Sequence, residues 1–321
     1  MADRKNVLIT SIAAKEPMIS AFVAAARQVE LSVIGCDADP AAPATEIVDS
    51  FRQIPPTNSP QFETEILSLC DKNDIGLIIP SRDGDLLPLA AMAGVFQARG
   101  IIVPLPDKTI IETCLDKGQF CHFLTSNGFR SIPILDDICT TDLPVFARAR
   151  YGAGGRGNYR IESLDEALVL LSNDDYLVHP FLEYPEYSID VLSDFEGRPI
   201  QAVARERRQV VNGEANLTTI RSRPLLEKQS LELAALLGLK GHSILQAFLP
   251  PDGDPIFIEA NLRFGGASIA SVNAGLDSPS RMLAMAFGPD RLRSRARQPA
   301  GITCGLTLSR TDQGDSFYLS E

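Results

Sequence analysis

A glycine-rich segment between two strand-like runs places the strongest constraint on the fold of this chain. The segment reads VFARARYGAGGRGNYRI over residues 145–161, with glycine at positions 152, 154, 155 and 157. Glycines at this density let the backbone adopt positive φ angles and approach an anionic or flat surface closely. The flanking runs 144–149 and 158–161 have strand character, so we expect a β-hairpin whose turn folds over phosphates. A surface hairpin without a ligand is the alternative.

Three other glycine loops do not fit the sequence. A Walker loop needs lysine and a hydroxyl residue after its second glycine, but here Gly157 is followed by Asn158. A protein kinase needs the tripeptides HRD and DFG, and neither occurs. A dinucleotide-binding fold needs glycines after its first strand, where this chain has SIAAKEP and no glycine before Gly35. An NAD-dependent dehydrogenase is therefore disfavoured.

The first third of the chain alternates between strand and helix patterns. The runs VLIT (7–10), LSVIGCDAD (31–39) and GLIIP (76–80) predict strands, and the amphipathic runs 18–28 and 62–72 predict helices. This alternation is typical of an α/β fold with a parallel, doubly wound sheet.

Two acidic pairs follow predicted strands, at the end of the sheet where open α/β folds bind ligands. Asp37 and Asp39 stand where a ribose-binding acid could lie, although polar residues that end a strand are the favoured interpretation. Asp83 or Asp85 could contact a substrate, although a helix N-cap is the favoured explanation.

Length and composition exclude several classes of protein. At 321 residues the chain exceeds the usual size of one hydrophobic core, so we expect two or three packed units. The net charge of −11 disfavours a protein that follows a nucleic-acid backbone. The longest apolar run, at 86–96, is too short to cross a membrane, and the amino-terminal apolar run lacks the length of a signal peptide. We expect a cytoplasmic protein that binds neither nucleic acid nor membrane.

The six cysteines show neither a CxxC pair nor a histidine at metal-ligand spacing. We therefore expect reduced cysteines in the core rather than a zinc site or a disulfide framework.

The second half brings together residues suited to a nucleotide and a metal. In the predicted hairpin 245–266, Glu259, Asn261 and Arg263 alternate along the second strand and are expected to share one face. Carboxylate and amide oxygens are the ligands that Mg²⁺ prefers, and arginine suits phosphate. Gln246 on the preceding strand can add a fourth group.

Taken in order, four motifs resemble those of the ATP-grasp enzymes, most closely the large chain of carbamoyl-phosphate synthetase. They are DKGQFCHFLTSNGFRSIP (116–133), the glycine hairpin, the hinge strands YLVHPFLEYPEYSIDV (176–191) and the E-x-N-x-R run from Glu259. The resemblance covers roughly residues 110–290. It implies a Rossmann-like domain over 1–110, a small lid subdomain over 111–180 and an α+β carboxyl-terminal subdomain over 181–321.

The resemblance also implies roles for single residues. Arg263 and Arg221 would be catalytic. Arg205 and Arg207, which share a strand face, would bind substrate, although solvated arginines are an equal alternative. The expected metal ligands are Gln246, Glu259 and Asn261. The expected ATP-binding residues are Lys117, Arg148, Gly154, Gly155, Arg156, His179, Phe181, Leu182 and Glu186.

The activity implied by the resemblance is ligation driven by ATP. A carboxylate attacks the γ-phosphate of ATP to give an acyl-phosphate, and an amine or thiol then displaces phosphate. The cofactors would be ATP and Mg²⁺, with Mn²⁺ as the alternative ion, and the partners small carboxylates and amines, with a homodimer left open. The other interpretation is a nucleotide-binding regulator or a subunit of a split synthetase without turnover of its own.

Overall fold

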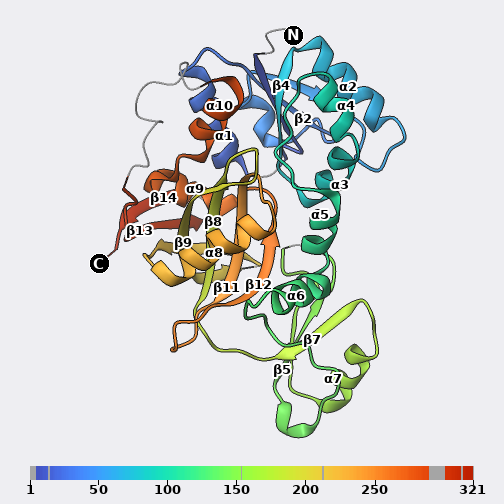
Figure 1. Cartoon of the computed structure of the whole chain (residues 1–321), viewed down its shortest axis with the longest axis vertical. Coiled ribbons are helices and arrows are strands. Elements are labelled where there is room, and N and C mark those ends of the chain that lie inside the picture. The colour runs from blue at the N-terminus through green and yellow to red at the C-terminus, as the bar shows by residue number, and fades with distance from the viewer. Residues whose placement is uncertain are drawn as a thin grey trace.

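The computed structural model describes residues 5–13, 15–152, 154–211, 213–288, 301–311 and 314–320. Three β-sheets organise this part of the chain, and Figure 1 shows them in sequence order from blue to red. The first is parallel and the other two are antiparallel, so the predicted α/β fold with an α+β second half is confirmed.

The amino-terminal sheet has four parallel strands in the order β3-β2-β1-β4. Its strands are β1 (Asn6–Thr10), β2 (Val33–Asp37), β3 (Ser50–Gln53) and β4 (Ile75–Pro80). Helices α1 (Glu16–Arg27), α2 (Phe62–Lys72), α3 (Asp83–Ala91) and α4 (Ala93–Ala98) belong to this part of the molecule. The sequence predicted three of the four strands and helices α1 and α2. It missed β3 because SFRQ, at the edge of the sheet, carries two charged or amide side chains and only one large apolar one.

A small antiparallel sheet carries the glycine hairpin. Helices α5 (Lys108–Leu115) and α6 (Lys117–Ser126) lead into its strands β5 (Val145–Ala149), β6 (Tyr159–Ile161) and β7 (Tyr176–Pro180), with helix α7 (Leu164–Leu171) between the last two. Strand β5 pairs with both β6 and β7, so the predicted hairpin is confirmed. In Figure 1 this sheet and α7 form the lower end of the molecule.

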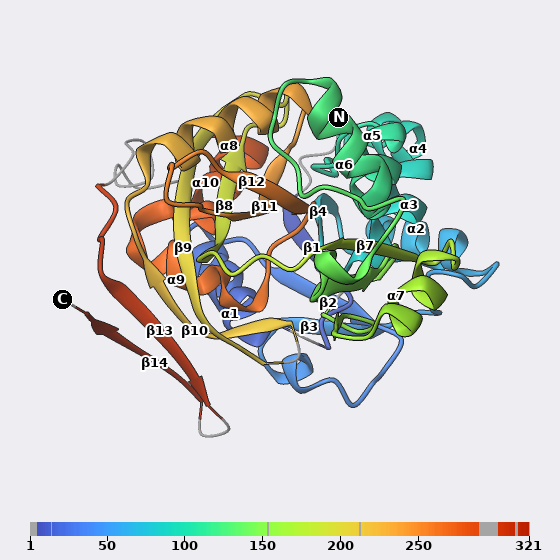
Figure 2. The ribbon, with the colours of Figure 1, turned by 90° about the horizontal axis from the view of Figure 1, so that it is seen from below.

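The third sheet has seven strands in the order β12-β11-β8-β9-β10-β13-β14. They are β8 (Glu186–Ser193), β9 (Pro199–Val211), β10 (Glu214–Ile220), β11 (Gly241–Phe248), β12 (Ile256–Asn261), β13 (Leu306–Thr311) and β14 (Gly314–Leu319). Helix α8 (Pro224–Leu236) packs on β8 and β9, while α9 (Ile269–Ser271) and α10 (Ser278–Phe287) lie beyond the loop that follows β12. Figure 2 shows the long curved ribbon of β9 and β10 from below.

The first and third sheets share their hydrophobic cores. One core cluster includes Leu8 and Ile78 of the parallel sheet together with Tyr187, Leu245 and Phe257 of the seven-stranded sheet. The small sheet has a separate core, built on Val145, Ala147, Ile161, Ala167 and Val178. The predicted domain boundaries at 110 and 180 stay a prediction, and the shared core means that the first and third units bury apolar surface against each other.

Two expected absences can be compared with the described residues. Among the described residues, no helix is long and apolar enough to cross a membrane. The cysteines are free, and four of them (Cys36, Cys70, Cys114 and Cys121) are buried, whereas Cys139 and Cys304 are exposed. The expectation of reduced core cysteines therefore holds for four positions and is wrong for two.

A buried carboxylate, Asp190 on β8, ties the seven-stranded sheet to the loop after β12. It is fully buried and lies 2.5 Å from Arg205 Nε on β9. His242 Nε2 lies 3.1 Å from its Oδ1 and, because a carboxylate only accepts, must donate to it. The hydroxyl groups of Ser268 and Ser271 donate to Oδ1 and Oδ2 at 2.6 and 2.5 Å. Four donors thus converge on one buried charge.

Burial alone would raise the pKa of Asp190. The positive charge of Arg205 and the hydrogen bond from His242 outweigh burial and hold the pKa well below its ordinary value. A carboxyl group with a lowered pKa stabilises the folded state above its unfolded-state pKa of about 4. That contribution is lost as the pH falls through the lower folded-state pKa.

We expect Asp190→Asn to lower the free energy of unfolding by about 3–5 kcal/mol, because it leaves Arg205 buried without a counter-ion. Urea denaturation at pH 7 measures the change. The control Arg198→Ala, which breaks an exposed ion pair with Asp194, should cost less than about 1 kcal/mol. Wild-type stability should also decline below about pH 4, and more steeply than in the variant. Equal costs for the two variants would contradict the role of this network.

Candidate functional site

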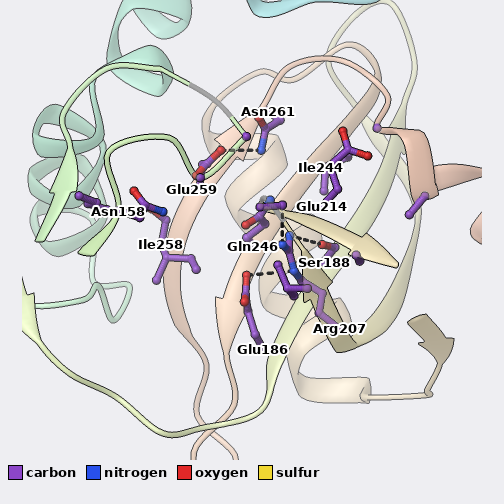
Figure 3. Close-up of a pocket in the computed structure, with 18 of the residues that line it drawn as sticks. Asn158, Glu186, Ser188, Arg207, Glu214, Ile244, Gln246, Ile258, Glu259 and Asn261 are labelled. Carbon is purple, nitrogen blue, oxygen red and sulfur yellow. Dashed lines mark hydrogen bonds and ion pairs between the residues drawn. The ribbon is translucent and has the colours of Figure 1, made fainter. Parts of the chain in front are cut away.

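A cavity of about 480 Å³ lies between the unit that carries the glycine hairpin and the seven-stranded sheet. Its lining comes from Lys117 on α6, the hairpin turn 154–158, strands β8 to β12, and the loop 265–267. Figure 3 shows side chains from these elements directed towards one another. Segments more than a hundred residues apart in the sequence therefore contribute to one site.

Strand pairing places four polar residues in one row across the seven-stranded sheet. Glu259 on β12 is opposite Gln246 on β11, Gln246 is opposite Ser188 on β8, and Ser188 is opposite Arg205 on β9. Paired residues have side chains on the same face, so the row forms the floor of the cavity. Asn261 shares this face because it lies two residues beyond Glu259.

The expected metal ligands are together. Asn261 Nδ2 donates to Glu259 Oε1 at 3.0 Å, and Gln246 is the register partner of Glu259. One carboxylate and two amide oxygens are the hard donors that Mg²⁺ binds, so the residues fit this ion. Among the described residues there is no group of three or more His, Cys, Asp or Glu that could hold a metal ion, so the remaining oxygen ligands would have to come from phosphate or water.

Arg263 lies in this site, but not on the strand that the alternating pattern predicted. Strand β12 ends at Asn261, two residues earlier. Arg263 Nη2 donates to Asn261 Oδ1 at 3.2 Å and to Asp83 Oδ2 at 2.6 Å. The guanidinium group thus joins the end of β12 to the first turn of α3 in the amino-terminal unit.

The favoured interpretation of Asp83 and Asp85 as helix N-caps is wrong. The N-cap of α3 is Arg82, and both acids lie within the first helical turn. Asp83 pairs with Arg263, and Asp85 is fully buried and accepts hydrogen bonds from Thr10 and Ser11. By contrast, Asp37 accepts from the backbone N–H groups of residues 13 and 39, in agreement with its interpretation as a residue that ends a strand.

Lys15 is a charged residue near the site that the sequence did not reveal. It precedes α1 with a left-handed backbone, and its Nζ donates to the carbonyl of Ser81. Burial and then the nearby charge of Arg263 lower the pKa of Lys15 to about 7, against the opposing charge of Asp83. No motif marks this lysine in the sequence, because its surroundings form only when the parallel sheet packs against the loop after β12.

The turn of the glycine hairpin lines one side of the cavity. Lys117 Nζ donates to the carbonyl oxygen of Gly152 at 2.8 Å. The pKa of Lys117 is lowered, and burial is the main cause. Gly154 and Gly155 line the cavity. They lie so close to Gly213, in the turn between β9 and β10, that a Cβ atom on residue 213 would be 2.4 Å from the carbonyl carbon of Gly154. The hairpin and the turn can approach this closely only because residue 213 is glycine. Arg156, expected to bind ATP, is exposed and does not line the cavity.

On the opposite wall, Arg148 is buried and holds His179 behind the cavity. Arg148 Nε donates to His179 Nε2 at 2.9 Å, so the histidine proton is on Nδ1, which lies 2.6 Å from the carbonyl oxygen of Pro133. Burial and then the charge of Arg148 lower the pKa of His179 to about 3. The His179 side chain therefore faces away from the cavity. Phe181 stacks under Arg160 and Leu182 packs on an apolar cluster, so neither side chain, both expected to bind ATP, lines the cavity.

The two arginines expected to bind substrate both line the cavity. Arg207 Nε lies 3.2 Å from Glu186 Oε1, and Figure 3 shows this pair beside Ser188. Burial is the main cause of the raised pKa of Glu186, and Arg207 opposes it. Arg221 does not belong to this set: it lies 3.5 Å from Glu206, which alternation places on the opposite face of β9.

The comparisons with known proteins agree with this architecture. Residues 172–304 match a family described as ATP-grasp in the biosynthetic pathway with Ter operon, and residues 7–104 match the PylC-like N-terminal domain. Mitochondrial pyruvate carboxylase from Mus musculus is 24% identical over 229 residues, which are 62% of this chain and 19% of that protein. The chain thus spans about a fifth of the length of this curated relative.

Solved structures of similar fold include those of three enzymes. The N5-carboxyaminoimidazole synthetase from Staphylococcus aureus, complexed with ADP, has a TM-score of 0.72 at 15% identity over 96% of this chain and 82% of that chain. Biotin carboxylase from Campylobacter jejuni has a TM-score of 0.70 at 17% identity, covering 95% and 74%. L-amino acid ligase from Bacillus licheniformis has a TM-score of 0.69 at 17% identity, covering 95% and 78%.

The family matches, the three-sheet architecture and the cavity agree with one another. The narrower resemblance to the large chain of carbamoyl-phosphate synthetase stays a prediction, whereas the broader resemblance to ATP-grasp enzymes is confirmed for residues 172–304, which match an ATP-grasp family.

Proposed function

We propose that this protein is an ATP-dependent ligase that activates a carboxylate as an acyl-phosphate and transfers the acyl group to an amine or thiol, releasing ADP and phosphate. The observation that carries the proposal is the convergence of Lys117, the glycine hairpin and the Glu259–Asn261 strand end on one cavity of about 480 Å³. That volume suits a nucleotide with a small substrate beside it.

Phosphoryl transfer requires positioning and charge neutralisation rather than a nucleophilic side chain. The glycine hairpin would cover the phosphates with backbone N–H groups, and Lys117 would exchange its bond to the Gly152 carbonyl for a phosphate oxygen. Glu259, Asn261 and Gln246 would hold Mg²⁺, which supplies charge neutralisation to the phosphates when bound. Mn²⁺ offers the same coordination chemistry as the alternative ion.

Arg263 would act on the charge that grows during transfer. Its Nη2 donates to both Asp83 and Asn261, and its Nε has no hydrogen-bond partner among the described residues. A preorganised arginine at this point can stabilise the developing charge on the γ-phosphoryl oxygens without reorganisation.

One observation favours a second candidate, a nucleotide-binding protein without turnover. The metal strands carry one carboxylate, Glu259, beside the amides of Gln246 and Asn261. A single negative charge holds Mg²⁺ more weakly than two. Phosphate release, measured with a panel of amino acids and small carboxylates, separates the two candidates. A protein that binds MgATP but releases no phosphate with any combination of these substrates would support the second candidate.

We expect the hairpin turn over residues 151–158 to exchange its amide hydrogens more slowly when ADP and Mg²⁺ are bound, because phosphates occupy N–H groups that four glycines leave weakly packed. Hydrogen exchange read by mass spectrometry measures the change. The exposed turn around Gly253, distant from the cavity lining, serves as the internal reference. Unchanged exchange over 151–158 at saturating nucleotide would contradict the phosphate-covering role.

Glu259→Gln should abolish Mg²⁺-dependent nucleotide binding and turnover together, because it removes the only carboxylate of the metal site. Calorimetry with ADP in the presence and absence of Mg²⁺ measures the first effect, and phosphate release measures the second. Glu183→Gln, at an exposed position before β8, is the matched control and should resemble the wild type. Full Mg²⁺ dependence in Glu259→Gln would place the metal elsewhere.

Arg263→Ala should lower kcat by on the order of 10² or more while ADP affinity stays within a few-fold, as expected for an interaction made mainly in the transition state. Steady-state phosphate release and ADP calorimetry measure the two quantities. Arg198→Ala provides an exposed control. An unchanged kcat would reduce Arg263 to a structural link with Asp83.

A further inference from the structure

We propose that Arg205 is a substrate-binding residue that anchors a second, non-reacting carboxylate of the substrates. This inference rests on the proposed ligase function and adds the chemical class of its substrates. The shared chemistry is a carboxylate that is not phosphorylated, carried either by a dicarboxylate acceptor or by an amino acid that supplies the amine.

One edge of the Arg205 guanidinium group is fixed by hydrogen bonding, and the other edge has an unpaired donor. Its side chain is 2% exposed, and its Nε is bound to Asp190, whose two oxygens also accept from His242, Ser268 and Ser271. Its Nη1 is buried and has no hydrogen-bond partner among the described residues, although the residue lines the cavity. A buried guanidinium donor without an acceptor is costly, and a ligand oxygen would remove that cost.

The neighbouring groups also offer donors rather than acceptors. Ser188 is the register partner of Arg205 and is buried in the cavity floor, where its hydroxyl can donate. Arg207 Nη1 lies 3.4 Å from that hydroxyl oxygen. Both carboxylates on β8 are already paired, Glu186 with Arg207 and Asp190 with Nε of Arg205. A planar guanidinium edge beside a hydroxyl group fits a carboxylate better than a cation or an apolar group.

The location separates this carboxylate from the reacting one. Arg205 stands three strands away from Glu259 in the same row, which is about 14 Å at the usual spacing of strands. The row runs away from β12, the strand that contacts Arg148 and the small sheet. A carboxylate at Arg205 is therefore too far from the metal strand to be the one that attacks ATP, and it must belong to a non-reacting end of a substrate.

The test compares substrates with and without that carboxylate. Phosphate release is measured with amino acids against their α-amides and with dicarboxylates, such as succinate, against their monoamides, such as succinamate. The wild type should prefer the free carboxylate by at least tenfold in kcat/KM. If amino acids are preferred over their amides, the anchored carboxylate belongs to the amine substrate. If dicarboxylates are preferred over their monoamides, it belongs to the acceptor.

Arg205→Lys keeps a positive charge beside Asp190 but removes the planar guanidinium group that can donate two parallel hydrogen bonds to a carboxylate. It should raise KM for the preferred carboxylate at least tenfold, with KM for the matching amide and for ATP within threefold. Ser188→Ala, which leaves the Asp190–Arg205 pair intact, should raise the same KM a few-fold. Arg208→Lys, on the exposed face of the same strand, is the control and should change neither. Equal KM changes for carboxylate and amide would assign Arg205 a structural role only.

Binding without turnover separates this inference from the proposed function. Calorimetric titration of the nucleotide-free wild type with succinate and with succinamate, and with each amino acid and its amide, should show at least fivefold preference for a carboxylate member. Arg205→Lys should lose that preference. If no pair supports phosphate release but the preference is present, the ligase proposal fails and the anchor stands. If no pair shows a preference in the wild type, the anchor is overturned.

Discussion

The buried charge of Asp190 is the interaction on which the rest of this site depends. A carboxylate with no exposure to water is stable only when donors satisfy it, and here they come from β9, β11 and the segment after β12. The sheet and the loop are thereby fixed to each other at one point. Because that loop begins at the end of β12, the same interaction sets where Asn261 and Arg263 lie relative to Arg205.

Strand register carries this order across the sheet. The row from Glu259 to Arg205 exists because Gln246 pairs with both Glu259 and Ser188, and Ser188 pairs with Arg205. The register of β11 against β12 shifts only beyond Gln246, between Gln246 and Ala247, and a shift before that point would turn these side chains to the other face. The row has acceptor oxygens at one end and donor groups at the other. A substrate that lies along the row would therefore meet the proposed metal site and the proposed carboxylate site in a fixed direction.

Local patterns in the sequence were sufficient for much of the fold and part of the site. Helix α2 agrees with its predicted span, and the glycine hairpin and the Glu259–Asn261 alternation follow from periodicity and turn chemistry. The pairing of Arg263 with Asp83 could not be predicted, because residues 180 positions apart meet only through packing of the first sheet on the third. Arg221, to which the resemblance gave a catalytic role, does not line the cavity and instead lies 3.5 Å from Glu206, a contact that no motif in the sequence reveals.

The Arg263–Asp83 pair gives the amino-terminal unit a part in the proposed chemistry. An arginine that binds ground-state phosphate too tightly would lower KM without raising kcat. Asp83, at 2.6 Å, offsets the charge of Arg263 and competes with phosphate for it, so the arginine gains most from a group whose negative charge increases. Lys15 lies beside this pair, and its lowered pKa limits the positive charge there. The parallel sheet thus does more than support the fold: it supplies the counter-charge that would make Arg263 selective for the transition state.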